Sequence, residues 1–195
     1  MSPSTFVAEW IPTLATRIEP PRRALDLAMG RGRHATLLAR HGFQTFGVDL
    51  KHDVVRDAVA AAARDGLIVR GWCADLEQSS LPVATFDLVV VTRYLQRSLF
   101  PSIRNAVKPG GFVLYETFTV AQRLLGTGPA SAHHLLEPGE LRDRFSGWDV
   151  LFYEEVASPE AVARLAAQRS FNARNASRGS DAQPGPPASC EGSAW

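Results

Sequence analysis

The sequence contains only two cysteines, Cys73 and Cys190, and no Cys-x-x-Cys pair. A disulfide framework and a cysteine-based zinc site are therefore not expected, and we expect no bound metal and a reducing, cytoplasmic setting. An excess of one charge is also lacking, because 21 basic residues face 20 acidic ones. This balance gives no overall attraction to nucleic acid or to anionic membranes, so both are disfavoured as partners.

Long apolar runs are missing as well. The first 23 residues hold no uninterrupted apolar stretch, so no signal peptide is expected. The longest apolar runs, such as residues 88–91, are far too short to span a bilayer. Large apolar residues almost disappear after residue 169, where Gly, Pro, Ser and Ala dominate. That composition predicts a disordered tail over 170–195.

What remains is a chain of ordinary single-domain size with enough apolar residues for a core, 45% of the total. We expect one folded domain over residues 1–169, beginning with a helix and linker over 1–21. Its apolar segments are short, and helical patterns separate most of them. Strands are expected at 23–28, 44–48, 67–72, 86–92, 112–117 and 148–156. Helices are expected at 5–15, 34–41, 54–65, 99–107 and 138–145. This alternation predicts a parallel α/β sheet.

Two segments are harder to assign from local pattern. Pro109-Gly110-Gly111 is expected to stop the helix at 99–107 and to turn the chain into the strand that begins at residue 112. Residues 159–168 are rich in alanine, and this composition favours a helix.

The sharpest motif lies between the first predicted strand and the helix that follows it, where Asp26 precedes Gly30 and Gly32. Glycines there let a ligand approach the backbone closely, and a helix N-terminus offers free N–H groups to an anion. Two ligand classes use this layout, namely dinucleotides and S-adenosylmethionine. An ordinary strand-to-helix turn is the alternative without a ligand.

The spacing separates the two ligand classes. A dinucleotide pattern, Gly-x-Gly-x-x-Gly, centred on Gly30 requires glycines where this chain has Ala28 and Arg33. The methyltransferase pattern, acid-x-Gly-x-Gly-x-Gly, fits Asp26, Gly30 and Gly32, with Ala28 in place of one glycine. Asp26 would then face the ammonium of the ligand. Three arginines are candidates to face its carboxylate: Arg31, Arg33 and Arg93.

Further polar residues follow the next predicted strands. Asp49 can accept hydrogen bonds from ribose hydroxyls, although a solvated acid at a strand end is the alternative. Asp75 can accept from the adenine amino group, and the Leu76 N–H can donate to the ring. A turn or helix cap is the alternative role for Asp75. Thr92, Arg93 and Tyr94 follow the fourth strand, where cofactor and substrate would meet.

Together these motifs resemble the class I S-adenosylmethionine-dependent methyltransferases over residues 22–168. The residues that carry the resemblance are Asp26, Gly30 and Gly32, then Gly47-Val48-Asp49, Ala74-Asp75-Leu76, 86–90 and 108–111. The stretches at 31–35, 115–119 and 134–141 resemble the tellurite-resistance-type branch, which acts on small molecules.

The resemblance implies a Rossmann-like, doubly wound α/β sheet of seven strands in the order 3-2-1-4-5-7-6, with strand 7 antiparallel. Residues 148–156 would be strand 6 and residues 161–168 strand 7, against their helix propensity. It also implies S-adenosylmethionine as cofactor. The implied cofactor contacts are Asp26, Ala28, Gly30, Gly32, Arg33, Asp49, Leu50, Ala74, Asp75, Leu76, Thr92 and Arg93.

The expected reaction is in-line methyl transfer, for which an acceptor with an acidic proton needs a base. The candidates are Tyr94, Glu116 and the histidine pair His133-His134, with structural or surface roles as alternatives. The chain lacks the Asn/Asp-Pro-Pro-aromatic stretch that methyltransferases of nucleic-acid amino groups often carry after strand 4, so a small-molecule acceptor is favoured. An RNA or protein methyltransferase and a non-catalytic S-adenosylmethionine-binding module remain alternatives.

Overall fold

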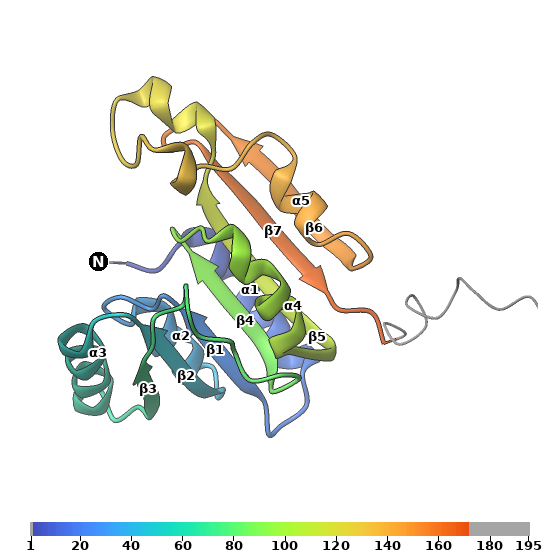
Figure 1. The fold of residues 1–195 in the computed structure, drawn as a ribbon. Helices are drawn as coiled ribbons and strands as arrows, with labels where there is room; N and C mark the ends of the chain where they lie inside the picture. The colour runs from blue at the N-terminus through green and yellow to red at the C-terminus, as the bar shows by residue number, and fades with distance from the viewer. Residues whose placement is uncertain (1, 172–195) are drawn as a thin grey trace, which may run out of the picture.

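The computed structural model describes residues 2–171 and contains one seven-stranded sheet in the order β3-β2-β1-β4-β5-β7-β6 (Figure 1). The strands are β1 (Arg23–Leu27), β2 (Gln44–Asp49), β3 (Val69–Cys73), β4 (Phe86–Thr92), β5 (Val107–Phe118), β6 (Asp149–Val156) and β7 (Val162–Gln168). The pairs from β3 to β5 are parallel, whereas β7 is antiparallel to both β5 and β6. This confirms the predicted strand order and the direction of strand 7.

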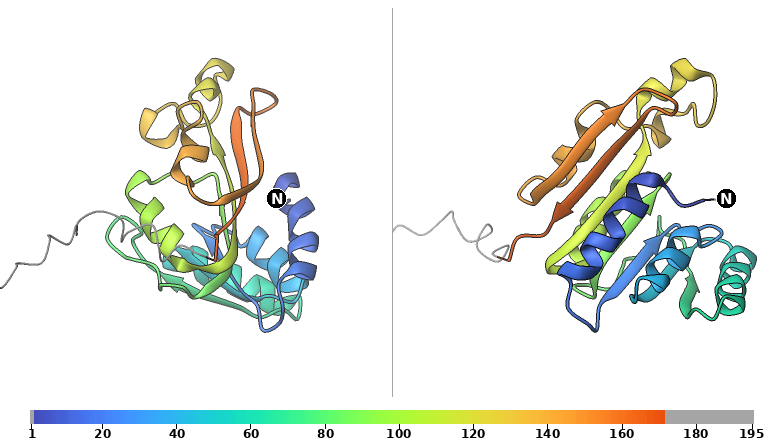
Figure 2. Two further views of the ribbon diagram at one scale, coloured as in Figure 1. Left: turned by 90° about the vertical axis from the view of Figure 1, so that its right-hand side faces the viewer. Right: turned by 180° about the vertical axis from the view of Figure 1, so that it is seen from behind.

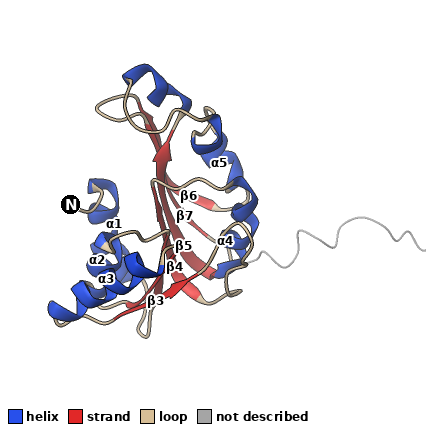
Figure 3. Ribbon diagram, turned by 60° about the vertical axis from the view of Figure 1, so that its left-hand side comes forward, coloured by secondary structure: helices blue, strands red, loops and turns tan. Residues whose placement is uncertain are grey.

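Helices cover both faces of the sheet, so the molecule has three layers (Figure 3). The helices α1, α2 and α3 lie on one face, and α4 and α5 lie on the other (Figure 2). Their bounds are α1 (Thr5–Arg17), α2 (Arg33–Arg40), α3 (His52–Arg64), α4 (Phe100–Ala106) and α5 (Glu140–Arg144). Short 3-10 helices are η1 (Arg97–Leu99), η2 (Val120–Leu125) and η3 (Ala132–His134). No helix within residues 2–171 has the length and hydrophobicity that a bilayer crossing requires.

The alternation of apolar side chains along the central strands creates a core on each face. Leu88 and Val90 of β4 pack with Ile11 and Leu14 of α1, and Val89 packs on the opposite face in the core that α4 and α5 complete. All five side chains are fully buried, as is expected for a strand that is covered on both faces. The two cores hold the ends of the central strands in fixed positions.

The local pattern failed at residues 161–168, where alanine content favoured a helix. The chain forms β7 instead, between β5 and β6, and Ala163, Ala166 and Ala167 are buried there. Small side chains suit this position because β7 is buried on both faces. Ala163 and Ala167 pack in the core on one face of the sheet, and Ala166 packs in the core on the other. Tertiary pairing therefore overrides the helix propensity, as the family resemblance implied.

The prediction that Pro109-Gly110-Gly111 separates the helix from its strand is also corrected. Helix α4 ends at Ala106, and β5 begins directly at Val107, which pairs with Phe86. Pairing with β4 shifts register and resumes at Phe112, so residues 108–111 bulge out within the strand. Gly110 adopts a φ of +79°, a conformation that glycine tolerates and other residues rarely adopt.

The domain extends slightly beyond the predicted boundary at residue 169. The backbone of Arg169 exchanges hydrogen bonds with Gly110 and Gly111, and its guanidinium donates to carbonyls at the end of α4, including that of Arg104. The Ser170 hydroxyl donates to the carbonyl of Gly147, and the ring of Phe171 lies against Gly110. The remainder of the predicted tail, 172–195, lies outside the described residues.

Candidate functional site

The predicted acids meet where parallel strands end. Asp26 in β1 pairs with Gly47 of β2 on one side and with Val90 of β4 on the other. Asp49 closes β2, and its carboxylate accepts a 2.8 Å hydrogen bond from the backbone N–H of Gly30. The loop after β1 is thus tied to the end of the neighbouring strand. This edge of the sheet is the position at which open α/β sheets bind ligands.

Asp26 is the most unusual of these residues. Only 1% of it is exposed, and its Oδ2 accepts a 2.8 Å bond from the N–H of Ala35. Its Oδ1 is buried and has no hydrogen-bond partner among the described residues. Burial raises the pKa of Asp26 to about 8, although the Ala35 bond and the positive charge of Arg33 act in the opposite direction. A buried acceptor without a donor fits a cationic group, such as the ammonium of an amino acid.

The backbone of the glycine loop explains how one glycine can be missing. Ala28 has a φ of +54°, in the left-handed region that glycine occupies most easily, so it keeps the shape of the loop at the cost of strain. Gly30 and Gly32 also have positive φ, +51° and +74°. The next side chain, Met29, lies over Gly47, where a Cβ atom would come within 1.9 Å of its sulfur. Gly47 is therefore needed for the loop to pack on β2.

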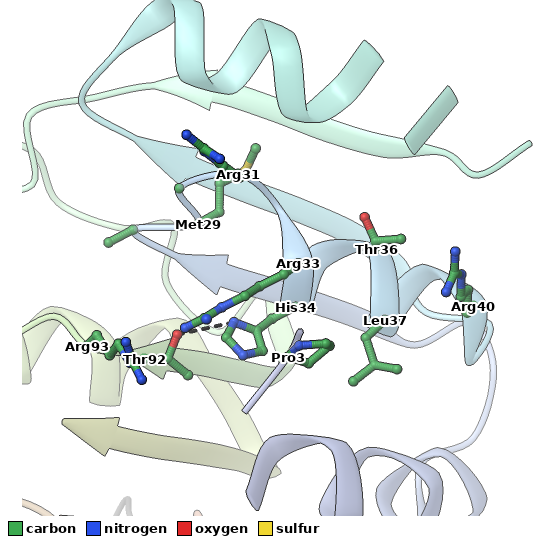
Figure 4. Close-up of a pocket in the computed structure, with 12 residues that line it drawn as sticks. Pro3, Met29, Arg31, Arg33, His34, Thr36, Leu37, Arg40, Thr92 and Arg93 are labelled. Atoms are coloured by element: carbon green, nitrogen blue, oxygen red, sulfur yellow. Dashed lines mark hydrogen bonds between the residues drawn. The ribbon is translucent and has the colours of Figure 1, made fainter. Parts of the chain in front are cut away.

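A cavity of about 610 Å³ opens beside this loop (Figure 4). We call it the glycine-loop cavity. It is lined by Pro3, Ala28, Met29, Gly30, Arg31, Arg33, His34, Thr36, Leu37, Arg40, Thr92 and Arg93. Arg33 extends from the start of α2 toward Thr92 and Arg93 (Figure 4). Burial, and then the like charge of Arg93, lower the pKa of Arg33, so an anionic group bound between them would relieve the repulsion.

A second, smaller cavity of about 370 Å³ lies beyond Arg93. We call it the cap cavity because Pro129 and His134, from the segment between β5 and α5, form part of its wall. It is lined by Glu77, Arg93, Tyr94, Leu95, Gln96, Phe118, Pro129 and His134. Arg93 lines both cavities, has a φ of +54°, pairs with Glu160 at 2.6 Å and stacks on the ring of Phe118. It therefore separates the two spaces.

The other residues predicted to contact a cofactor differ in their surroundings. Leu50 is 65% exposed beside Asp49, so it offers a bare apolar surface at the strand ends, whereas Leu76 is buried. The carboxylate of Asp75 accepts bonds from the N–H of Glu77 and the side-chain amide of Gln78. Asp75 therefore shapes its own turn, which was the alternative role, and its contact with adenine stays a prediction.

Two of the proposed bases lie in unsuitable surroundings. Glu116 is buried, and its carboxylate forms a 2.6 Å ion pair with Arg164, which also pairs with Glu154 on β6. Glu116 lines neither cavity. It lies opposite Arg164, which the antiparallel pairing of β5 with β7 brings next to it. His133 is exposed, and its neighbour His134 lines the cap cavity instead. Tyr94 does line that cavity; burial raises its pKa, as do the charges of Glu77 and Asp75.

Sequence reasoning assigned no role to His34, which the structure places in the glycine-loop cavity. The residue is 1% exposed, and both ring nitrogens are engaged by Ser4 and Thr92. A polar residue on the buried face of α2, directly after the glycine loop, is the signal that could have identified it.

The comparisons with known proteins agree with this geometry. A sequence profile described as a methyltransferase domain matches residues 24–111. Residues 24–111 are thus similar to a methyltransferase domain, and the chain has the class I methyltransferase fold. These findings confirm the fold that the resemblance implied. Methyltransferases of this fold use S-adenosylmethionine as methyl donor.

Among solved structures, the S-adenosylmethionine dependent methyltransferase from Mesorhizobium loti superposes with a TM-score of 0.63 at 21% identity. The match covers 83% of this chain and 98% of that one. TehB from Haemophilus influenzae gives a TM-score of 0.69 at 16% identity, over 86% of this chain and 64% of TehB. Both likenesses establish the fold of this chain.

Curated relatives are similar in sequence over part of their length. The ribosomal protein L11 methyltransferase from Thermus thermophilus is 37% identical over 103 residues, which is 52% of this chain and 40% of that protein. A ubiquinone biosynthesis O-methyltransferase from Bordetella avium is 27% identical over 153 residues, 68% of this chain and 63% of that protein. The chain therefore spans about half the length of these relatives.

Proposed function

We propose that this protein is an S-adenosylmethionine-dependent methyltransferase that acts on a small molecule. The observation that carries the cofactor assignment is the Oδ1 of Asp26, which is buried near Arg33 and has no hydrogen-bond partner among the described residues. The amino acid end of S-adenosylmethionine carries the two opposite charges that these residues can bind. Its ammonium is suited to Asp26, and its carboxylate is suited to Arg33 and Arg93. A nicotinamide dinucleotide has no such group to offer.

The remaining parts of the cofactor have partners along the same edge. Asp49 would accept from the ribose hydroxyls, since its Oδ2 accepts from Gly30 and its Oδ1 accepts only a longer, 3.3 Å bond from the N–H of Lys51 among the described residues. The exposed side chain of Leu50 would pack on adenine, and the N–H of Leu76 would donate to the ring. When bound, the sulfonium supplies the electrophilic methyl group, so the protein needs to orient the acceptor and to exclude water.

The cap cavity supports a small molecule as the methyl acceptor. Its volume of about 370 Å³ is near the lower end of small-ligand sites, and aromatic and apolar side chains form much of its wall. Glu77, Tyr94 and His134 are the side chains in its lining that can exchange a proton with an acceptor. The ubiquinone biosynthesis relatives are named as O-methyltransferases, which is consistent with a hydroxyl acceptor.

A protein acceptor is the second candidate, because the Thermus relative is named for methylation of a ribosomal protein. That acceptor would need to place its side chain in the cap cavity, past the wall that Pro129 and His134 form.

The test begins with calorimetric titration of S-adenosylmethionine, S-adenosylhomocysteine and NAD in parallel. Binding of the first two, without NAD, is expected. Transfer of a labelled methyl group is then measured to a panel of small phenols, thiols, amines and carboxylates, and separately to ribosomal proteins and total RNA. Binding of NAD alone would refute the cofactor assignment, and labelling of protein or RNA alone would refute the small-molecule acceptor.

A further inference from the structure

The start of the described chain crosses the glycine-loop cavity. We call residues Ser2, Pro3 and Ser4 the N-terminal strap. Pro3 lines the cavity, and in Figure 4 its backbone trace runs beside His34. The guanidinium of Arg33 donates a 3.3 Å hydrogen bond to the carbonyl of Ser2. The strap is thus part of the cavity wall.

The imidazole of His34 joins this strap to the sheet. The backbone N–H of Ser4 donates a 3.0 Å hydrogen bond to Nε2, so Nε2 is the acceptor of the ring. In a neutral imidazole the proton is then on Nδ1, which faces the hydroxyl of Thr92 at 3.2 Å (Figure 4). Burial, together with the positive charges of Arg33 and Arg93, lowers the pKa of His34 to about 4, so the ring is neutral at pH 7.

The two bonds connect three elements that meet at one edge. Ser4 caps α1, His34 lies in the first turn of α2, and Thr92 is the last residue of β4. Thr92 directly precedes Arg93, which separates the two cavities. A single side chain therefore fixes the position of the strap relative to the strand end that carries Arg93.

We propose that His34 is a positioning residue, which latches the N-terminal strap to the end of β4 and so holds one wall of the cofactor site. This inference rests on the proposed function, because it assigns the glycine-loop cavity to the amino acid end of S-adenosylmethionine. The cofactor enters when the bond between Ser4 and His34 opens, and closure of the strap slows its release.

Two conservative substitutions separate the two bonds of the latch. His34→Gln carries a carboxamide near the position of Nε2, so it can still accept from Ser4 while it loses Thr92. His34→Asn carries the carboxamide near the position of Nδ1, so it keeps the partner in β4 and frees the strap. Thr92→Val removes the hydroxyl at almost constant volume, so it tests the bond to β4 from its other end. Thr16→Val, which removes an exposed hydroxyl from α1, is the matched control.

The readouts are amide hydrogen exchange of residues 2–10 in the free protein, affinity for S-adenosylhomocysteine by calorimetry, and its dissociation rate by stopped flow. His34→Asn is expected to speed exchange in the strap and to weaken affinity about tenfold or more, mostly through faster dissociation. His34→Gln and Thr92→Val lose only the bond to β4, so they are expected to leave exchange in the strap close to the wild-type rate and to weaken affinity by less than His34→Asn does. Thr16→Val is expected to change neither quantity.

Equal loss of affinity in His34→Asn and His34→Gln, with strap exchange unchanged in both, would overturn the latch, since a general packing defect produces that result. The two proposals also fail separately. If the wild-type protein does not bind S-adenosylhomocysteine, the proposed function and the role of the strap as a cofactor wall are both overturned. If it binds, and His34→Asn binds equally well, the latch alone is overturned.

Discussion

The backbone N–H of Gly30 donates a 2.8 Å hydrogen bond to the carboxylate of Asp49, which joins the loop after β1 to the end of β2. Gly30 lies between two residues with positive φ, and its amide is held in place by this one acceptor. The carboxylate that is proposed to bind the ribose therefore also shapes the loop that is proposed to bind the amino acid end.

Asp49→Ala should weaken binding of S-adenosylhomocysteine about tenfold or more. The ribose loses its acceptor, and the loop loses the bond that fixes Gly30, at a combined cost of about 1 to 3 kcal/mol. Calorimetry measures the effect. The control is Asp57→Ala, which removes an exposed acid from α3 that pairs only with its neighbour Arg56. Equal affinities for Asp49→Ala and the wild-type protein would exclude the ribose role.

Cofactor binding should release a proton from Asp26. In the free protein, burial raises its pKa to about 8, so the side chain is mostly protonated at pH 7. A bound ammonium favours the carboxylate, and affinity should therefore rise between about pH 6 and pH 7.5, by up to tenfold per pH unit. Titrations in two buffers with different ionisation enthalpies should show release of close to one proton. Heats that do not depend on the buffer would contradict this coupling.

The same residue should make the ligand-free protein less stable as pH rises. Because its pKa is raised on folding, the folded protein retains a proton that the unfolded chain releases above about pH 4. The free energy of unfolding therefore falls between about pH 4 and pH 8. Asp26→Asn should remove most of this fall and raise stability at pH 7.5 by about 1 to 3 kcal/mol, while weakening cofactor binding. Urea denaturation at pH 5 and pH 7.5 distinguishes the two proteins.

Exchanging alanine and glycine in the loop should have opposite effects at neighbouring positions. Ala28→Gly removes the strain of an alanine in the left-handed region but adds conformational entropy to the unfolded state. The free energy of unfolding should therefore rise by about 0 to 1 kcal/mol. Gly30→Ala meets no neighbouring atom within 4 Å, so its cost of about 1 to 2 kcal/mol reports backbone strain alone. Chemical denaturation measures both. A stabilised Gly30→Ala variant would show that the loop has another conformation.

Glu116 should contribute to stability and not to cofactor binding. Arg164→Met leaves a buried carboxylate with no cation, so the free energy of unfolding should fall by about 2 to 3 kcal/mol at pH 7. Adding Glu116→Gln to that variant should restore part of the loss, and Glu116→Gln alone should leave the affinity for S-adenosylhomocysteine within about threefold. If Glu116→Gln instead keeps full stability and loses methyl transfer by 10² or more, Glu116 is the base that the sequence suggested.

The end of the folded domain can be located by two truncations. A chain that stops after Phe171 should keep its melting temperature within about 2 °C, whereas one that stops after Gln168 should melt several degrees lower. The shorter chain loses Arg169, which binds the end of α4 and the bulge at Gly110. Differential scanning fluorimetry compares them. Equal melting temperatures would show that residues 169–171 do not contribute to the stability of the fold.

The sequence predicted the strand ends better than the side chains around them. The apolar run of β4 located this strand to the residue. The glycine loop was also predictable, because Gly30 and Gly32 adopt positive φ, a backbone conformation that glycine adopts most easily. Strand β7 was not accessible to local pattern, because its alanines are selected by packing between β5 and β6. Only the resemblance to a family supplied it.

Candidate bases were harder to predict for a related reason. Glu116 lies near the carboxyl end of β5, where the sequence predicted the site. Its partner Arg164 is 48 residues away in sequence and becomes its neighbour only through the antiparallel pairing of β5 with β7. His34 was overlooked because its two partners, Ser4 and Thr92, lie far away on either side in sequence. Long-range pairing of polar groups leaves no periodic signal in the sequence.

The N-terminal strap has a practical consequence for handling this protein. Since the Ser2 carbonyl accepts a hydrogen bond from Arg33 and Pro3 lines the glycine-loop cavity, an affinity tag joined ahead of Ser2 would be attached beside that cavity. Such an extension would crowd the opening or pull the strap away from His34. Binding constants measured before and after tag removal are therefore expected to differ.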